Sequence, residues 1–331
     1  MDKELNKPIF VVGSPRSGTS ILTWCLGHHP NIFPVPESNW MGDYAINVAL
    51  AYRIGAARDY YSILSAMDIP DDELFAAFGR SINDLILRHR TDLEKKRYAN
   101  RIELKLEPSW IKAASTAAGP KTRWVDGTPG YSFHMHGLRK LFPDALFVHL
   151  VRDVWAIVRS MINFHRVTGI QLVANEEEAY RYWMRTVSAC LMAERAYGPS
   201  VVRRIRYSDL INAPESTMCS LLDFLSEPYS ARCLEPLSQR INSSNVPDDF
   251  KADDPATDPA VVEEATRLSR DLEQTAQPGD ASRAAADEME AAFVKRVQYI
   301  ATLDSQYQRA LQLARDPAKQ QHHRVTSHEP G

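Results

Sequence analysis

Residues 8–22 read Pro-Ile-Phe-Val-Val-Gly-Ser-Pro-Arg-Ser-Gly-Thr-Ser-Ile-Leu, and this stretch decides the fold. Its apolar start is typical of a buried central strand. Gly13 and Gly18 then bracket a tight turn. Thr19 and Ser20 open a helix, and the N–H groups and dipole at a helix start favour an anion. The stretch therefore predicts a strand, a phosphate-binding loop and a helix.

The loop differs from that of nucleoside triphosphatases in the place of its cation. Those enzymes carry a lysine before the final Ser or Thr, whereas here Thr19 stands at that position and the cation is Arg16. Asp126 and Asp153 are imperfect candidates for the aspartate that would hold a metal. We therefore expect a phosphate group that is bound without a metal. A helix dipole contributes only about 0.3–1 kcal/mol, and micromolar binding requires roughly 8 kcal/mol, so further cations must contribute.

A second candidate anion site follows the apolar segment 147–151. Arg152 comes directly after this segment, at the carboxyl end of a predicted strand, where open α/β sheets bind their ligands. Ser160 lies eight residues further along, about two helical turns away, and can face the same crevice. Alone, the Arg152–Asp153 pair would indicate ordinary surface chemistry. Together with the first loop, it indicates a second point of attachment for the same ligand.

Composition and charge exclude several classes of partner. The chain has 331 residues and a formal net charge of −3, so no global field attracts nucleic acid. No apolar run approaches the 18 residues or so of a membrane span, and the charged N-terminus has no signal-peptide core. We therefore expect a cytoplasmic protein. Its four cysteines are scattered and are predicted to be buried thiols: Cys25, Cys190, Cys219 and Cys233.

The order of apolar segments predicts an α/β fold, a parallel sheet flanked by helices. Strands are expected at 9–12, 123–125, 145–151 and 201–207. Residues 1–250 are expected to form the main domain, with a helical insertion at about 40–118. Further helices are expected at 175–197 and about 212–225.

Residues 251–331 are expected to form a helical C-terminal extension with a disordered tail. Its helices are predicted at 261–274 and 288–313. The second of these has apolar residues at steps of three and four, which gives it one apolar face. That face either packs on the main domain or pairs with a second chain, so a homodimer is a possible assembly.

Together these motifs resemble the sulfotransferase family that uses 3′-phosphoadenosine 5′-phosphosulfate (PAPS), and above all its bacterial and tyrosylprotein branch. Residues 15–20 are similar to the family's 5′-phosphosulfate loop, and residues 150–161 to its 3′-phosphate motif. Residues 206–210 resemble the strand end that borders the nucleotide, and residues 241–244 the late loop that closes over it. The resemblance covers about residues 8–246 and implies the P-loop nucleotide-binding fold.

The resemblance implies transfer of a sulfuryl group from PAPS to a hydroxyl or amine, by in-line displacement, with a general base and without a metal. Arg16 would stabilise the leaving group, and Glu37 would be the base. His134 or His136 is the competing base. The residues expected to bind the donor are Arg16, Ser17, Gly18, Thr19, Ser20, Arg152, Ser160, Tyr207, Ser243 and Ser244. The acceptor would be a small molecule, whose identity the side chains of the insertion do not define.

Two positions depart from the family pattern. Many relatives carry a lysine where Gly127 stands, and Lys121 or His134 could take over its charge. A further basic residue is replaced by Phe164, next to His165 and Arg166, which could substitute.

Two other functions remain open on these residues. A P-loop kinase acting on a small molecule would need a loop lysine and Mg²⁺. A non-catalytic nucleotide-binding or scaffold protein of the same fold would bind nucleotide without turnover, and Gly127 is the best argument for it.

Overall fold

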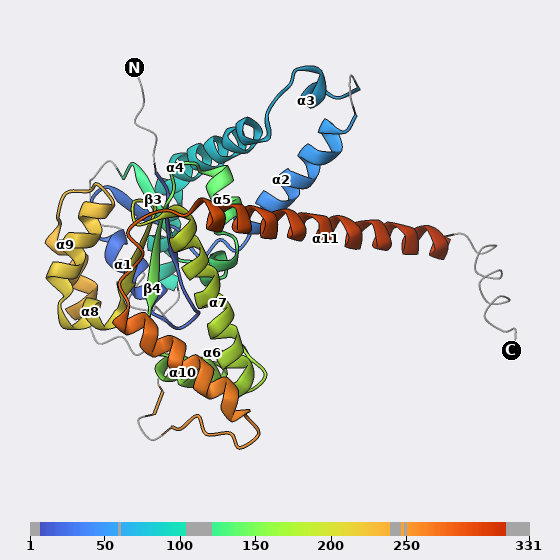
Figure 1. Ribbon diagram of the computed structural model, residues 1–331. Coiled ribbons are helices and arrows are strands. Elements are labelled where there is room, and N and C mark those ends of the chain that lie inside the picture. Colours follow the sequence, from blue (N-terminus) through green and yellow to red (C-terminus); the bar gives the residue numbers. More distant parts are fainter. Residues whose placement is uncertain (1–6, 59–60, 104–120, 239–245, 248–249, 316–331) are drawn as a thin grey trace, which may run out of the picture.

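The computed structural model describes residues 7–58, 61–103, 121–238, 246–247 and 250–315, and its centre is a parallel sheet (Figure 1). Within these residues, five strands lie in the order β2-β3-β1-β4-β5, and neighbouring strands are parallel. The strands are β1 (Ile9–Val12), β2 (Ile32–Pro34), β3 (Arg123–Asp126), β4 (Leu146–Val151) and β5 (Val202–Arg206). The predicted α/β class is confirmed.

Two strand predictions are corrected by the structure. Strand β2 was not predicted, because three residues are too few to show an alternating pattern; it pairs with β3 through Ile32 and Arg123. Tyr207 was expected to end a strand, but it is the first residue of helix α8 (Tyr207–Asn212). Its side chain therefore leaves the sheet at the carboxyl edge, where the ligand is expected.

Helices cover both faces of the sheet, because side chains alternate along each strand. Ile9 and Val11 of β1 pack with α1 (Thr19–Gly27), α9 (Pro214–Phe224) and the 3-10 helix η4 (Ala231–Ser238).

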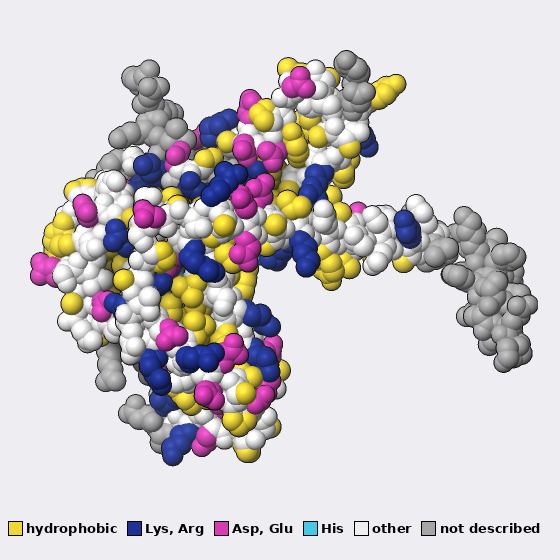
Figure 2. Space-filling view, viewed as in Figure 1, with side chains coloured by type: hydrophobic (Ala, Val, Ile, Leu, Met, Phe, Trp, Pro, Cys, Tyr) yellow, Lys and Arg dark blue, Asp and Glu magenta, His cyan; other side chains and the backbone are white. Residues whose placement is uncertain are grey.

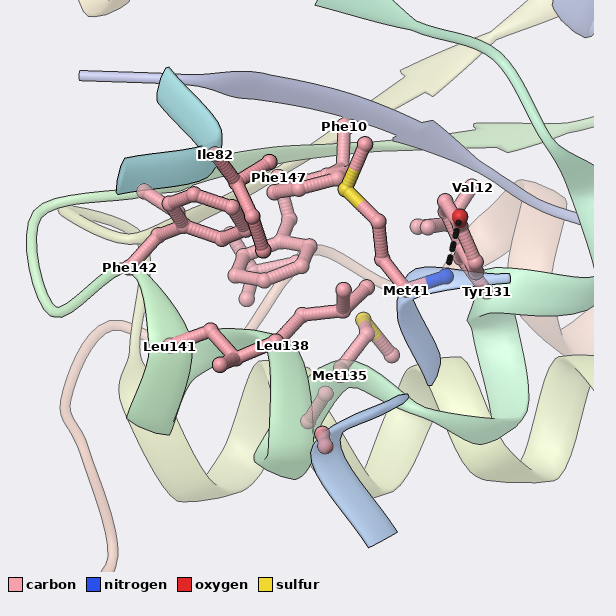
Figure 3. Close-up of a cluster of buried hydrophobic side chains, with 14 of the residues drawn as sticks. Phe10, Val12, Met41, Ile82, Tyr131, Met135, Leu138, Leu141, Phe142 and Phe147 are labelled. Atoms are coloured by element: carbon pink, nitrogen blue, oxygen red, sulfur yellow. Dashed lines mark hydrogen bonds between the residues drawn. The ribbon is translucent and has the colours of Figure 1, made fainter. Parts of the chain in front are cut away.

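Phe10 and Val12 point to the opposite face, into the cluster of Figure 3. The helices that pack there are α2 (Met41–Ala56), α4 (Asp71–Glu103), α5 (Met135–Leu141) and α7 (Glu176–Tyr197). Both sides of β1 are thus fully apolar, as its sequence predicts.

The predicted insertion is helical over its described residues. Helices α2 and α4 extend away from the sheet and meet near the short helix α3 (Ile63–Ala66) (Figure 1). Residues 104–118 of the insertion lie outside the described residues. The base of α2 is tied to the 3-10 helix η3 (Pro129–Phe133), where Tyr131 Oη accepts a hydrogen bond from the Met41 N–H at 3.1 Å (Figure 3).

The two helices of the C-terminal extension pack on the main domain. Helix α10 (Pro259–Gln274) buries Val261 and Ala265 against α7 and α6 (Val154–Thr168). Helix α11 (Arg283–Arg315) starts before the predicted residue 288 and buries Val297. Its far half projects from the body (Figure 1), and residues 316–331, the predicted disordered tail, lie outside the described residues.

The surface agrees with the small net charge. On the face shown in Figure 2, basic and acidic side chains are interspersed rather than gathered by sign. In the part of the chain that the structure describes, no helix is long and apolar enough to cross a membrane. Cys25, Cys190 and Cys233 are buried as predicted, but the prediction for Cys219 is wrong. Cys219 is exposed because α9 turns its neighbours Met218 and Leu221 toward the core instead.

Candidate active site

The loop between β1 and α1 has the geometry of an anion cradle. A Cβ at Gly13 (φ 144°) would lie 2.5 Å from the Leu150 carbonyl oxygen, so this position requires glycine. Gly18 starts α1 with φ 105°, and no described side chain caps the helix. Ser17 is buried, and its Oγ has no hydrogen-bond partner among the described residues. Donors without acceptors at a helix start are what a phosphate or sulfate needs.

Two arginines meet at this loop, Arg16 of the loop itself and Arg152, which follows strand β4. Arg16 Nε donates a hydrogen bond to Ser160 Oγ at 3.0 Å, and Arg152 Nη1 donates to the Arg16 carbonyl oxygen at 3.0 Å. The Arg152 guanidinium also lies 4.5 Å from the ring centroid of Tyr207. Burial, and then Arg152, lower the pKa of Arg16, whereas Glu37 acts in the opposite direction. The structure thus brings both predicted anion motifs into one site.

The two aspartates considered as metal ligands have local structural partners. Asp153 caps α6, because its Oδ1 accepts a hydrogen bond from the Ala156 N–H at 2.9 Å. Asp126 is fully buried, and its Oδ1 accepts from the N–H and the hydroxyl of Thr128 at 2.9 and 2.6 Å. Asp153 therefore starts the helix that carries Ser160, and Asp126 shapes the turn after β3.

Glu37 lies in the loop between strand β2 and helix α2. The Val35 N–H donates to the Val125 carbonyl oxygen at 2.9 Å, which carries the pairing of β2 and β3 toward this loop. Glu37 is exposed to solvent, yet the surrounding protein raises its pKa, and the charge of Asp126 adds to that effect. Arg16 lowers the same pKa. A carboxylate with a raised pKa beside the anion cradle has the properties of a general base.

The competing histidines face away from the loop. His134 packs on α2, where a Cβ at Gly42 would lie 2.4 Å from its ring. Burial, and then Arg296, lower the pKa of His134 to about 4. The His136 Nδ1 lies 3.1 Å from Tyr197 Oη, and burial lowers its pKa to about 4 as well. The charged and hydrogen-bonding groups around these histidines belong to α2, α4, α5, α7 and α11, and Arg16 is not among them.

Gly127, at the position of the family lysine, packs closely against Thr23 of helix α1. A Cβ at Gly127 would lie 2.2 Å from Thr23 Oγ1, so a side chain there would require Thr23 to shift. Lys121 does not replace it, because its Nζ donates to the carbonyl oxygens of Gly27 at 3.1 Å and Ile32 at 3.0 Å. Lys121 therefore holds the C-terminal end of α1.

The second departure is explained by stacking. Phe164 lies under Arg16, with the guanidinium carbon 4.6 Å from its ring centroid. His165 Nδ1 contacts the Ile162 carbonyl oxygen of its own helix at 2.8 Å, and Arg166 lies over the Phe250 ring. Sequence reasoning missed the contact of Phe164 with Arg16. The available signal was its position one helical turn after Ser160.

Two further features concern the edge of the site. A cavity of about 230 Å³ opens at the carboxyl ends of β4 and β5, beside Arg152 and Tyr207. Its lining includes Glu273 of α10, a residue of the extension that the sequence did not single out. Ser243 and Ser244, predicted to close over the nucleotide, lie outside the described residues.

Comparison with known proteins identifies a family. The model of the sulfotransferase family matches residues 8–231. Protein-tyrosine sulfotransferase 1 of Danio rerio is 26% identical over 228 residues, which are 67% of this chain and 54% of that protein. The chain therefore spans about half the length of this relative.

Two solved structures are distant likenesses. The sulfotransferase domain of the Synechococcus PCC 7002 olefin synthase is 19% identical, with a TM-score of 0.42, covering 89% of this chain and 98% of that chain. Sulfotransferase STF9 from Mycobacterium avium is 18% identical, with a TM-score of 0.46, covering 84% and 80%. The assignment follows from the family model, which covers more than half of the sequence: the chain belongs to the sulfotransferase family, the enzymes that transfer a sulfuryl group to an acceptor.

Proposed function

We propose that this sulfotransferase takes its sulfuryl group from PAPS and transfers it to a hydroxyl or amine of a small-molecule acceptor, with Glu37 as the general base. The observation that carries the proposal is the meeting of Arg16, Arg152 and Ser160 at a loop whose Ser17 hydroxyl lacks an acceptor. A ligand with an anionic group at each end suits such a site.

The residues present fit this donor. The loop from Arg16 to Ser20 would bind the phosphosulfate end, through backbone N–H groups, hydroxyls and the guanidinium. Arg152 and Ser160 would bind the 3′-phosphate, Tyr207 would border the nucleoside, and Ser243 and Ser244 would contribute from the late loop. The donor itself supplies an activated sulfuryl group on a stable phosphate leaving group. Charge-assisted hydrogen bonds contribute about 1.5–3 kcal/mol each, so a few of them reach micromolar affinity.

The chain's own residues would then perform two tasks. Arg16 and the loop N–H groups stabilise negative charge as it grows on the leaving oxygen, without requiring a metal. Glu37 accepts the proton of the acceptor as that group attacks. A kinase is not favoured, because the loop has no lysine for a γ-phosphate.

A thermal-shift panel tests the donor. PAPS and 3′,5′-ADP should raise the melting temperature without Mg²⁺, because ligand at a hundred times its Kd stabilises a protein by about 2.7 kcal/mol. ATP should have little effect, since it lacks the 3′-phosphate. Arg152→Ala should reduce the shift caused by 3′,5′-ADP. A shift with ATP and Mg²⁺ alone would overturn the proposal.

Turnover is tested with labelled PAPS and a panel of alcohols, phenols, sugars and amines. Transfer of label to any of them supports the proposed enzyme and identifies its acceptor class. Tight binding of 3′,5′-ADP without transfer to any acceptor would instead support a non-catalytic nucleotide-binding protein.

A further inference from the structure

The guanidinium of Arg16 is held by helix α6 at two points. Its Nε donates a hydrogen bond to Ser160 Oγ at 3.0 Å, and its Cζ lies 4.6 Å from the centroid of the Phe164 ring. Ser160 and Phe164 are four residues apart on α6, so they lie on the same face of that helix. The polar contact fixes one edge of the guanidinium, and the ring supports its flat side.

The backbone of Arg16 is held as well. Arg16 has a φ of 71°, a left-handed conformation that is uncommon for a residue with a side chain. Arg152 Nη1 donates to the Arg16 carbonyl oxygen at 3.0 Å, which supports this conformation. The side chain therefore leaves the loop from a fixed point, and Ser160 and Phe164 are two of the groups along its path that set its direction.

The rest of the site makes this direction important. Gly127 stands where many relatives have a lysine, and it supplies no charge, while Thr23 would have to move to admit a side chain there. Lys121 is engaged at the end of α1. The proposed transfer thus relies on Arg16 for positive charge near Glu37. An arginine stacks on an aromatic face through both charge and its planar shape, which an aliphatic residue cannot reproduce.

We propose that Phe164 is a positioning residue for sulfuryl transfer: its ring is the surface that keeps the Arg16 guanidinium between Ser160 and Glu37. This inference rests on the function proposed above. A position at which some relatives carry a further basic residue thus holds a support for the loop arginine.

The proposal has a consequence for pH dependence. Glu37 faces two charged groups, Arg16 and Asp126, and Arg16 itself faces Arg152. Arg16 lowers the pKa of Glu37, whereas partial desolvation of the carboxylate and Asp126 raise it. If the guanidinium moves away from its place, the pKa of Glu37 rises further. The base then becomes protonated at higher pH, and the acidic limb of the rate profile moves upward.

The test uses the full-length chain, with PAPS and an acceptor identified by the label screen. Phe164→Leu should lower kcat about 5- to 30-fold, as expected for loss of a desolvated cation–π contact. Its acidic limb should move to higher pH. Phe164→Met removes the ring at similar volume and should act alike, which keeps the test valid if the leucine variant folds poorly.

Rescue and control variants separate positioning from structure. Phe164→Tyr and Phe164→Trp keep an aromatic face and should retain the kcat and the pH profile of the wild-type protein. Trp155→Leu removes another partly exposed aromatic ring from α6, one that packs on Tyr180, and should leave the pH profile unchanged.

The outcomes distinguish the two proposals. If the wild-type protein binds no 3′,5′-ADP, the proposed function fails, whatever Phe164 does. If the wild-type protein binds 3′,5′-ADP and transfers label, but Phe164→Leu and Phe164→Met keep the wild-type rate and pH profile, the positioning role is wrong. A lower rate with an unchanged profile that Phe164→Tyr does not rescue would also overturn it.

Discussion

At the residue scale, the surroundings of each titratable group decide its pKa and its access to an acceptor. Glu37 is an exposed loop residue, but partial desolvation of its carboxylate by the surrounding protein, and then Asp126, raise its pKa, while Arg16 lowers it. His134 is deeper in the protein, and burial lowers its pKa to about 4. The carboxylate is therefore close to the loop and open to an acceptor, whereas the imidazole is enclosed between helices.

Glu37→Gln should abolish transfer while leaving the affinity for 3′,5′-ADP unchanged. The amide cannot accept a proton at working pH, and positioned general bases contribute about 10²- to 10⁴-fold to rate. Calorimetry with 3′,5′-ADP and an assay with labelled PAPS measure the two properties separately. His134→Gln is the matched control and should keep its activity. Full activity of the Glu37 variant would return the role of base to His134.

Gly127→Ala should lower the free energy of unfolding by about 1–3 kcal/mol, the usual cost of overpacking. The new Cβ would lie 2.2 Å from Thr23 Oγ1, so either the Thr23 side chain or the backbone at residue 127 must shift. Gly130→Ala is the control, because no atom lies within 4 Å of its added Cβ. Chemical denaturation measures both. Thr23→Ala should restore stability in the Gly127→Ala background, and a stable single variant would contradict this account.

At the scale of elements, helix α7 is joined to the sheet by a buried ionic network. Glu194 of α7 lies between His149 of β4, at 2.6 Å from Nδ1, and Arg204 of β5, at 3.0 Å from Nε. Burial opposes the charge of His149, but Cys190 and Glu194 raise its pKa to about 9. Burial likewise opposes the charge of Glu194, but His149 and Arg204 lower its pKa. The network thus fixes α7 across two strands.

Because of this network, the stability of the protein should fall in both acid and alkali. The raised pKa of His149 contributes stability that is present below its unfolded pKa of about 6.5 and is lost as pH rises through about 9. The lowered pKa of Glu194 contributes stability that is lost in acid. Melting temperatures between pH 4 and 10 should therefore be highest near neutrality.

Glu194→Gln should destabilise the protein by about 3–5 kcal/mol, because it leaves the buried charges of its partners uncompensated. The same variant should lose the alkaline decline in melting temperature. Glu177→Gln, at a surface pair with Arg181 on the same helix, is the control and should change little, because the amide oxygen can still accept from the Asp258 N–H. An alkaline decline that persists in Glu194→Gln would assign it to another group.

At the scale of the whole molecule, the C-terminal extension is partly core and partly exposed. Val297 of α11 is 1% exposed, whereas Tyr299 and Tyr307 are 62% and 61% exposed on the projecting half. The division of the chain at residue 250 stays a prediction, although α10 and the near half of α11 pack on the main domain. The homodimer also stays a prediction, which the mass in solution decides.

A chain that ends at residue 302 should keep the melting temperature of the full chain, because the projecting half of α11 contributes little to the core. Phe293→Ala should lower the free energy of unfolding toward the lower end of the 3–5 kcal/mol range for buried aromatics, since the partly buried Phe293 packs against the core cluster beside Gly137 and the His136 ring. Light scattering on both chain lengths completes the test. A lower melting temperature and a smaller assembly after truncation would place the projecting half in an interface.

Prediction from sequence succeeded where the signal is local. Strand β1, the loop glycines and the start of α1 lie within one continuous stretch, and the spacing of Arg152 and Ser160 follows from a strand and two helical turns. The sequence did not predict strand β2, because the strand is too short to show a periodic pattern. The predicted burial of Cys219 was wrong, because packing sets the rotation of α9, and a single cysteine in the sequence does not reveal that rotation.

The sequence by itself determined that a strand, an anion-binding loop and a helix come first and that a second arginine ends another strand, because backbone conformation and helical spacing are properties of neighbouring residues. Only the tertiary structure decided which groups meet: Arg16 with Phe164, Gly127 with Thr23, and Glu37 rather than His134 beside the loop. These partners lie far apart along the chain, and the packing of helices on the sheet brings each pair together.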